Sequence, residues 1–213
     1  MIKPAEKLNP LRAIQNAKLS PVTVELAWRY LSGEFRNSIK PAEFSLSETD
    51  KSDLSDDMIY AKTVKLIAEQ APLQLISGEK LVGAATLLES AQHNTPGCEY
   101  RATSHVTIGF DRVVKSGIKE LYSRVEQRLA DSELSTEQCD FLLAMKMCVE
   151  AMRIWHQRQL QLLQELSSEN DKWQEVLAYF QQVPENPPQD FREAVQSLWF
   201  LFSFQRLCGN WSG

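Results

Sequence analysis

The apolar residues of this chain recur mainly three or four positions apart, which is the spacing that places them on one face of an α-helix. Stretches with this spacing alternate with short polar segments, so the pattern predicts a mainly α fold with one or two short extended segments. We read the whole chain as a single, mostly helical segment. The predicted helices cover residues 21–33, 55–70, 111–129, 136–166, 173–182 and 191–207.

Capping residues fix several of these helix ends. Ser20 precedes Pro21, a pair that suits an N-cap followed by the first helical position, and Gly33 suits the C-terminal cap. Ser55 before two aspartates marks the second start, because acidic side chains favour the positive end of the helix dipole. The residues Ser135 to Gln138 form a capping box.

The predicted core consists of the apolar stripes on these helices. Near the N-terminus the stripe is short, and on the long helix it runs for most of the length. Cys148 belongs to that long stripe and is therefore predicted to be a core residue. The members are Val22, Leu26, Ala27 and Tyr30 in the first helix, Ile59, Ala61, Val64, Ile67 and Ala68 in the second, and Phe141, Met145, Cys148, Met152, Trp155 and Leu162 or Leu163 in the long helix.

The last helix is apolar around most of its circumference, so it should be buried on most sides. Two prolines precede it, Asp190 can cap it, and Gly209 ends it. No later element follows to cover its outer side, which predicts self-association or docking of a partner through this helix. Its apolar members are Phe191, Ala194, Val195, Leu198, Trp199, Leu201, Phe202 and Leu207.

Two other stretches are not helical in pattern. Residues 100–108 alternate with period two, which argues for an extended strand or edge segment. Residues 34–57 end in a polar and acidic run, residues 45–57, which is typical of a solvated surface loop.

Composition excludes several classes of protein. The 213 residues carry a net charge of −5 with scattered Lys and Arg, which does not suit a nucleic-acid interface. The N-terminus lacks the apolar region of a signal peptide, and the longest apolar run, residues 198–204, is too short to span a bilayer. The four cysteines match no zinc motif, so we expect no metal. Because there is no secretion signal, we expect reduced thiols and a cytoplasmic location.

Three segments resemble the glycyl radical enzymes of the pyruvate formate-lyase and diol dehydratase superfamily. The clearest is V-P-x-x-P-P-x-x-F-x-E-A-V-Q-S-L-W-F followed by G-N-W-S-G, over residues 183–213. The second is A-P-L-Q-L-I-S-G-E-K-L-V-G, over residues 71–83, and the third is S-H-V-T-x-x-F-D-R-V-V-K-S-G, over residues 104–117. The resemblance implies the N-terminal helical portion of the α/β-barrel fold of that family.

The resemblance also implies candidate substrate contacts. His105 matches a histidine that contacts a substrate hydroxyl in the dehydratases, and histidine can donate or accept a proton near neutral pH. Ser212 falls between the two serines of the family's Gly-rich loop, where this chain has Asn210 in place of a histidine. Cys148-Val149-Glu150 imitates the family's thiyl loop, but it lies inside a periodic helix without a neighbouring glycine. We therefore assign no catalytic residue.

In the family, the thiyl cysteine and the radical glycine lie beyond the equivalent of Gly213. An intact relative needs a radical activase that uses S-adenosylmethionine, and it cleaves C–C, C–O or C–N bonds of a small polar substrate. The resemblance thus implies an N-terminal fragment that binds no cofactor and is inactive as this chain alone. Two alternatives remain at this point: a stand-alone helical module that docks on an intact enzyme or its activase, and an unrelated helical protein.

Overall fold

A computed structural model shows a mainly α-helical chain, as the sequence pattern predicts. The structure describes residues 20–34, 43–76, 79–83, 92–93, 109–169 and 171–209. Two short strands, β1 and β2, pair in parallel, with Glu43 opposite Gln92 and Phe44 opposite His93. The elements are α2 (Pro21–Ser32), β1 (Glu43–Phe44), α3 (Glu48–Lys51), α4 (Asp56–Gln70), β2 (Gln92–His93), α5 (Phe110–Leu129), α6 (Thr136–Glu169), η3 (Asp171–Trp173), α7 (Gln174–Gln182) and α8 (Phe191–Leu207).

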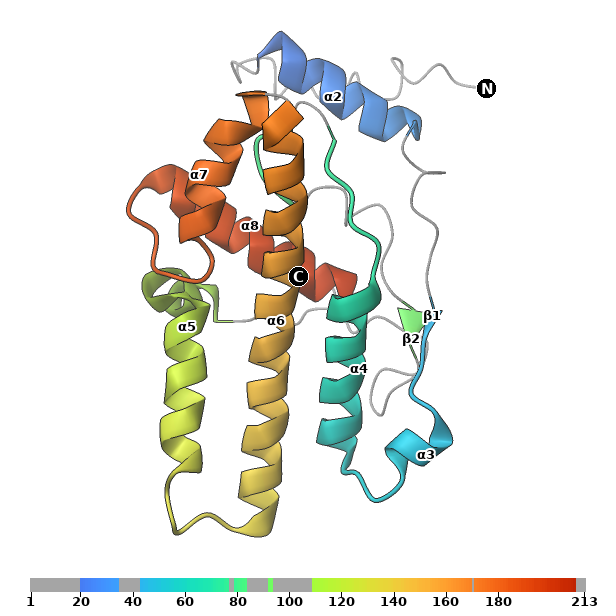
Figure 1. Cartoon of the computed structure of the whole chain (residues 1–213), viewed down its shortest axis with the longest axis vertical. Helices are drawn as coiled ribbons and strands as arrows, with labels where there is room; N and C mark the ends of the chain where they lie inside the picture. The colour runs from blue at the N-terminus through green and yellow to red at the C-terminus, as the bar shows by residue number, and fades with distance from the viewer. Residues whose placement is uncertain are drawn as a thin grey trace, which may run out of the picture.

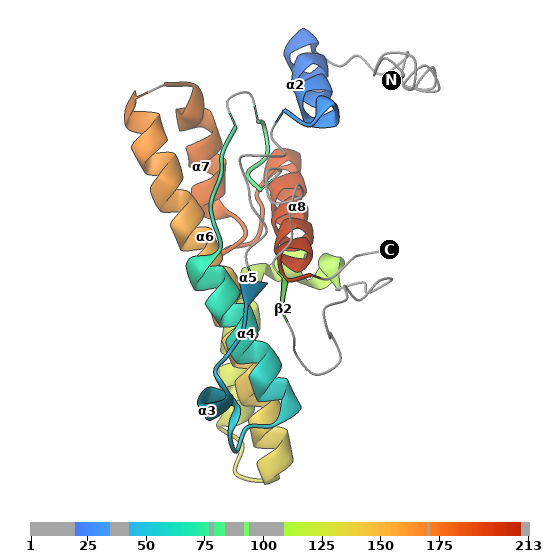
Figure 2. The same ribbon diagram turned by 90° about the vertical axis from the view of Figure 1, so that its right-hand side faces the viewer.

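Helices α4, α6 and α5 lie side by side in a layer, with the long α6 in the middle (Figure 1). Helix α8 stands on one side of this layer and crosses it only near the end where α7 lies (Figure 2). The hydrophobic core fills the space between that end of the layer and helices α7 and α8. Its fully buried large side chains include Ile67, Ile118, Trp155, Leu163, Phe180, Phe200 and Leu201.

The helix ends follow the predicted capping signals. The Ser55 hydroxyl accepts a hydrogen bond from the Met58 N–H (3.2 Å), and the Asp190 carboxylate accepts one from the Glu193 N–H (2.8 Å). Ser135 and Gln138 exchange both bonds of a capping box, at 3.0 and 3.2 Å. Each of these bonds supplies a partner to an N–H group that the helix itself leaves unpaired.

The apolar stripe predicted for α6 is only half covered, so the expectation that all of it is core is wrong. Trp155 and Leu163 are fully buried, whereas Phe141 is 50% and Met145 is 42% exposed. Because α8 and α7 cover only the C-terminal half of α6, the N-terminal half of the stripe extends past the core (Figure 2). Cys148 lies between the two halves and is partly buried, and burial raises the pKa of its thiol to about 11.

The predicted stripe on α2 is likewise not a buried face. Val22 is 56% exposed, and Val24, Trp28 and Leu31 on other sides of the same helix are also exposed. In the second predicted helix, α4, the residues Ala61, Val64, Ile67 and Ala68 are buried as predicted, whereas Ile59 is only partly buried. The apolar face of α4 is buried because α6 packs beside it. The spacing of apolar residues in α2 predicts an apolar face but does not predict that another element covers it.

Earlier elements, rather than later ones, bury most of α8. Phe200, Leu201, Phe204 and Leu207 are buried, and so are polar residues of the same helix. On the opposite side Phe191 is 85% and Leu198 is 44% exposed. The expectation of a helix buried on most sides is thus confirmed, and an outer side with exposed apolar residues remains.

Gly117 interrupts α5, which the sequence pattern predicts as one continuous helix. Its φ of 76° is a left-handed conformation that side chains other than hydrogen rarely tolerate. A Cβ at this position would lie 2.5 Å from the Glu185 carbonyl oxygen and 2.7 Å from the Asn186 carbonyl carbon. Both neighbours are backbone atoms, so they cannot rotate away as a side chain would.

We expect Gly117→Ala to lower the free energy of unfolding by at least about 3 kcal/mol, because it combines a strained φ with a backbone clash. Gly109→Ala is the matched control, since a Cβ there would meet only the Arg112 side chain at 3.6 Å or more. The control should cost less than about 1 kcal/mol. Urea unfolding of both variants makes the comparison, and equal losses would contradict the assigned role of Gly117.

A buried histidine stands at the contact between α6, α7 and α8. Nε2 of His156 donates a hydrogen bond to the Phe180 carbonyl (2.8 Å), and its ring meets those of Phe180 and Phe200 edge-on at 4.7 and 5.8 Å. Burial lowers the pKa of this imidazole below its ordinary value, an effect that Arg153 reinforces and Glu185 opposes. The native state therefore holds His156 neutral.

Because the folded pKa lies below the unfolded value near 6.5, the unfolded chain binds the proton first as pH falls. We predict that the stability associated with His156 is complete above about pH 6.5 and declines below it, by at most about 1.4 kcal/mol per pH unit. His156→Gln keeps an N–H donor but does not titrate, so its stability should change less between pH 6.5 and 5. Parallel unfolding curves for both proteins over this range would contradict the prediction.

Candidate functional site

The candidate site is the junction at which the motif segments around residues 71–83 and 104–117 meet the third one, residues 183–213, which contains α8. We define the motif junction as residues 76 and 79–83, residues 117–119, residues 183–186 and α8. In its centre the amide of Gln196, which is fully buried, pairs with the backbone of Val82. The Gln196 Oε1 accepts from the Val82 N–H at 2.8 Å, and its Nε2 donates to the Val82 carbonyl at 3.1 Å. One side chain thereby satisfies both polar groups of a buried residue.

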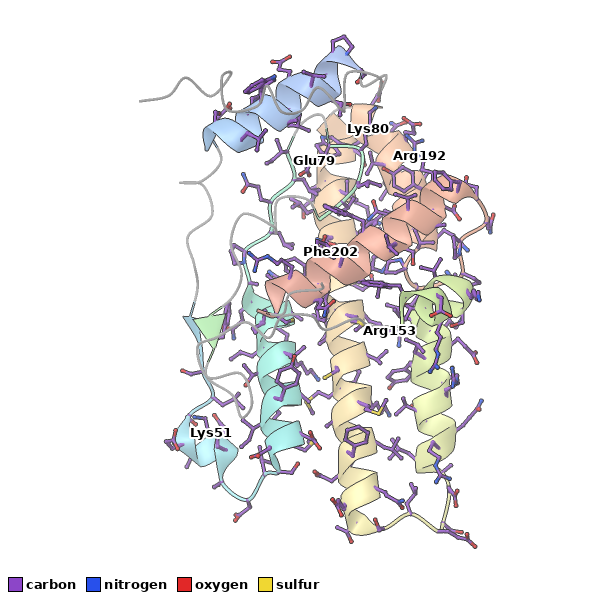
Figure 3. The ribbon with its side chains drawn as sticks, turned by 180° about the vertical axis from the view of Figure 1, so that it is seen from behind. Lys51, Glu79, Lys80, Arg153, Arg192 and Phe202 are labelled. Atoms are coloured by element: carbon purple, nitrogen blue, oxygen red, sulfur yellow. The ribbon has the colours of Figure 1, made fainter. Side chains whose placement is uncertain are left out.

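Further contacts hold the same segment in place. The Glu79 carboxylate is 6% exposed and accepts from the Ile76 N–H at 3.2 Å. The Tyr179 hydroxyl donates to the Lys80 carbonyl, and burial raises the pKa of this phenol to about 12. Arg192 of α8 lies 4.9 Å from the centre of the Tyr179 ring (Figure 3). The segment is thus bound by α7 as well as by α8.

Gly83 ends this segment in close contact with α8. Its φ is 109°, and an added Cβ would lie 3.0 Å from the Ser203 hydroxyl oxygen and 3.9 Å from the Trp199 ring. A glycine is therefore required both by the backbone conformation and by the approach to the helix. The backbone conformation of Gly83 and its close approach to α8 therefore explain why the motif ends in glycine.

The third motif segment meets the first through main-chain groups. The N–H groups of Ile118 and Lys119 donate to the carbonyls of Pro184 and Glu185, at 3.0 and 3.1 Å. The break at Gly117 frees these two N–H groups from the helix, so they can bind the turn that leads to α8. The Arg153 guanidinium then pairs with the Glu185 carboxylate at 2.7 Å and 3.2 Å, which fixes the same turn to α6 (Figure 3).

The described contacts at the motif junction hold backbone segments in position. Cys208, which directly follows α8, is 2% exposed and thus a packed thiol, and Nε2 of His156 binds the Phe180 carbonyl. Within the described part of the chain, no three His, Cys, Asp or Glu side chains are placed to hold a metal ion. The same part of the chain contains no helix long and apolar enough to cross a membrane.

The two predicted substrate contacts, His105 and Ser212, lie outside the described residues, as does the predicted strand at 100–108. Described residues lie on both sides of the stretch with His105 and before the one with Ser212. His93 and Gly109 bracket the stretch that contains His105, and Gly209 precedes the stretch that contains Ser212. The roles of His105 and Ser212 therefore remain predictions.

The sequence motifs include Gln196 and Gly117, but they predict no contact for either residue. Arg153 and Arg158 were not predicted as functional residues at all. The Arg158 guanidinium donates to the carbonyls of Ala68 and Ala71, at 2.6 and 2.8 Å, and closes the C-terminal end of α4. A signal existed for two of these residues. A glutamine in an apolar helix and a glycine inside a helical pattern both call for a tertiary explanation.

Comparison with known proteins supports the same grouping of segments. A family model described as "Pyruvate formate lyase-like" matches residues 1–211. The isethionate sulfite-lyases of Oleidesulfovibrio alaskensis and Nitratidesulfovibrio vulgaris are each 26% identical over 122 residues. That alignment covers 51% of this chain and 14% of either enzyme.

Solved structures share the fold at low sequence identity. A structure of 1,2-propanediol dehydration in Roseburia inulinivorans matches with a TM-score of 0.65 and 16% identity, over 82% of this chain and 31% of that one. The B12-independent glycerol dehydratase of Clostridium butyricum matches with a TM-score of 0.65 and 13% identity, over 84% and 34%. The chain thus spans about a third of these structures. With the family match over nearly its whole length, the chain belongs to the pyruvate formate lyase-like family of glycyl radical enzymes.

Proposed function

We propose that this chain is the N-terminal helical part of a pyruvate formate-lyase-like glycyl radical enzyme, and that by itself it is catalytically inactive. Its task in this proposal is to build one side of an active-site cavity. The protein's contribution to radical chemistry is a shaped, water-excluding site around the substrate. A helical scaffold would contribute to such a site by fixing the positions of the loops that line it.

The observation that carries the proposal is the convergence of the three motif segments on α8. Gln196 holds Val82, the Pro184–Glu185 carbonyls hold Ile118 and Lys119, and Gly83 packs on Ser203. These contacts fix Val82-Gly83 and residues 117–119, between which His105 lies in the sequence, and they fix α8, after which Ser212 follows. The motif junction itself contains no cysteine among its described residues. Cys208, just after α8, is buried, and burial raises the pKa of the Cys148 thiol on α6.

The substrate of the complete enzyme would be a small polar molecule. The similar structures concern 1,2-propanediol, glycerol and trans-4-hydroxy-L-proline, all of which carry a hydroxyl group. A histidine such as His105 could donate a hydrogen bond to a hydroxyl or accept one from it. The reaction would need a glycyl radical, installed in the cytoplasm by an activase that uses S-adenosylmethionine, and this chain would bind no cofactor.

A second function has one observation in its favour. The outer side of α8 leaves Phe191 85% and Leu198 44% exposed, and exposed apolar side chains grouped on one helix face are typical of a docking surface. The chain would then be a non-catalytic module that docks through its C-terminal helix on an intact glycyl radical enzyme or on its activase. Both functions predict that the isolated chain carries no radical.

We predict that the purified chain shows no glycyl radical signal by electron paramagnetic resonance after anaerobic incubation with S-adenosylmethionine and the activase of an intact relative. Turnover of glycerol, 1,2-propanediol and isethionate should also be absent. The physical reason is that a scaffold without a thiyl site and a radical glycine cannot start the chemistry. The intact relative, treated identically, serves as the positive control. A glycyl radical signal that arises from this chain would overturn the proposal.

A further inference from the structure

Two hydrogen-bond donors on α8 are buried without a partner. The Ser203 hydroxyl oxygen and Nε1 of the Trp199 indole are both buried, and neither has a hydrogen-bond partner among the described residues. Ser203 as a whole is 1% exposed, whereas Trp199 is only partly buried. Since nearly all buried polar groups in folded proteins bind protein or water, an unpartnered pair calls for an occupant.

Both donors border the backbone of Gly83. Residues 199 and 203 are four positions apart, so their side chains are neighbours on one face of the helix. A Cβ placed on Gly83 would lie 3.0 Å from the Ser203 hydroxyl oxygen. It would lie 3.9 Å from Cδ1 of Trp199, which is the ring atom bonded to Nε1. Because glycine has no side chain, residue 83 approaches both donors without placing a side chain over either of them.

The described groups around the pair are either already bonded or apolar. The Val82 carbonyl, one residue before Gly83, already accepts from Nε2 of Gln196 at 3.1 Å. The Phe202 ring stacks on the Trp199 indole, with ring centres 5.6 Å apart and an angle of 23° between the planes. This stacking holds the indole in place and adds an apolar wall. A few fixed polar groups in apolar surroundings are the usual composition of a small-molecule site.

The chemistry of the two groups limits what they can bind. An indole N–H only donates a hydrogen bond, whereas a serine hydroxyl donates one and also accepts. The complementary atom is therefore an acceptor that takes two hydrogen bonds at once. Hydroxyl and carboxylate oxygens do this, but an ammonium group would find no acceptor at Trp199.

We propose that Ser203 and Trp199 form a subsite for one oxygen atom of a small ligand, either a hydroxyl or a carboxylate oxygen. The Ser203 hydroxyl and the Trp199 Nε1–H both donate to this oxygen, and the stacked rings of Trp199 and Phe202 contact the carbon atoms beside it. Gln196 holds Val82, and thereby Gly83, next to the two donors. The inference deepens the proposed function and rests on it for the class of ligand, because the substrate proposed there is a small polar molecule.

The test follows the indole N–H resonance of Trp199 in a nitrogen–proton correlation spectrum of the isotopically labelled full chain. The chain has five tryptophans, and Trp199→Phe identifies the resonance that belongs to residue 199. Glycerol is the hydroxyl probe, and sodium acetate, compared with sodium chloride at equal ionic strength, is the carboxylate probe. We expect at least one probe to shift this resonance to saturation, because a new acceptor changes the environment of the N–H proton. Saturation by glycerol alone assigns a hydroxyl ligand, and saturation by acetate alone assigns a carboxylate.

Two serine variants on α8 test whether the Ser203 hydroxyl takes part. Ser203→Ala should raise the apparent dissociation constant of the saturating probe about fivefold or more, because one of two hydrogen bonds is lost. Ser197→Ala is the matched control and should leave the constant unchanged. The Ser197 hydroxyl is also buried and without a partner among the described residues, but it lies two positions before Trp199 and so on the other side of the helix. Circular dichroism checks that both variants are folded.

A second measurement on the wild type does not depend on how the variants fold. At saturation, a nuclear Overhauser effect should connect the carbon-bound protons of the probe with the Nε1–H of Trp199. The proposal is overturned by a resonance that neither probe saturates, by an unchanged constant in Ser203→Ala, by an equal loss in Ser197→Ala, or by the absence of this Overhauser effect. None of these outcomes bears on the radical measurement, because a chain that binds neither probe can still be an inactive N-terminal part. The proposed function therefore stands or falls separately.

Discussion

The polar backbone groups of two short segments, Val82 and Pro184–Glu185, need hydrogen-bond partners inside the protein. The residues that provide these partners determine how the chain is arranged. Val82 is 1% exposed, and its N–H and carbonyl both bind the side chain of Gln196. The carbonyls of Pro184 and Glu185 bind the N–H groups freed by the break at Gly117. A buried polar group left without a partner costs about 1–3 kcal/mol. These pairings therefore tie two distant stretches of sequence, at Val82 and at Ile118–Lys119, to α8 and to the turn that precedes it.

The same arrangement explains why the core lies at one end of the helix layer. Helix α8 can follow the turn at residues 183–190 only where α5 begins again at Ile118 and where Arg153 holds Glu185. It therefore covers the C-terminal half of α6, and among the described residues neither α7 nor α8 extends over the N-terminal half. The stripe of α6 is continuous in sequence, and its division into a buried and an exposed half is a consequence of topology.

Local features of the fold could be predicted from the sequence because local interactions cause them. The capping box at Ser135–Gln138, the cap at Asp190 and the buried face of α4 all depend on residues within a few positions of each other. The partial exposure of Phe141 and the pairing of Gln196 with Val82 depend on contacts between residues far apart in sequence. For the candidate site, the motifs included Gly83 and Gly117 but could not show that Gly83 packs against α8 and Gly117 against the turn before it.

The central claim is that the motif segments and α8 form one cooperative unit, and native-state hydrogen exchange tests it most directly. The amides of Val82, Ile118 and Lys119 are bound only through the motif junction, whereas the Phe204 amide lies within α8. Residues that open together exchange with the same free energy of opening. The account predicts a common value for these four amides. Exchange of Val82 or Ile118 at a much lower free energy, with Phe204 still protected, would contradict it.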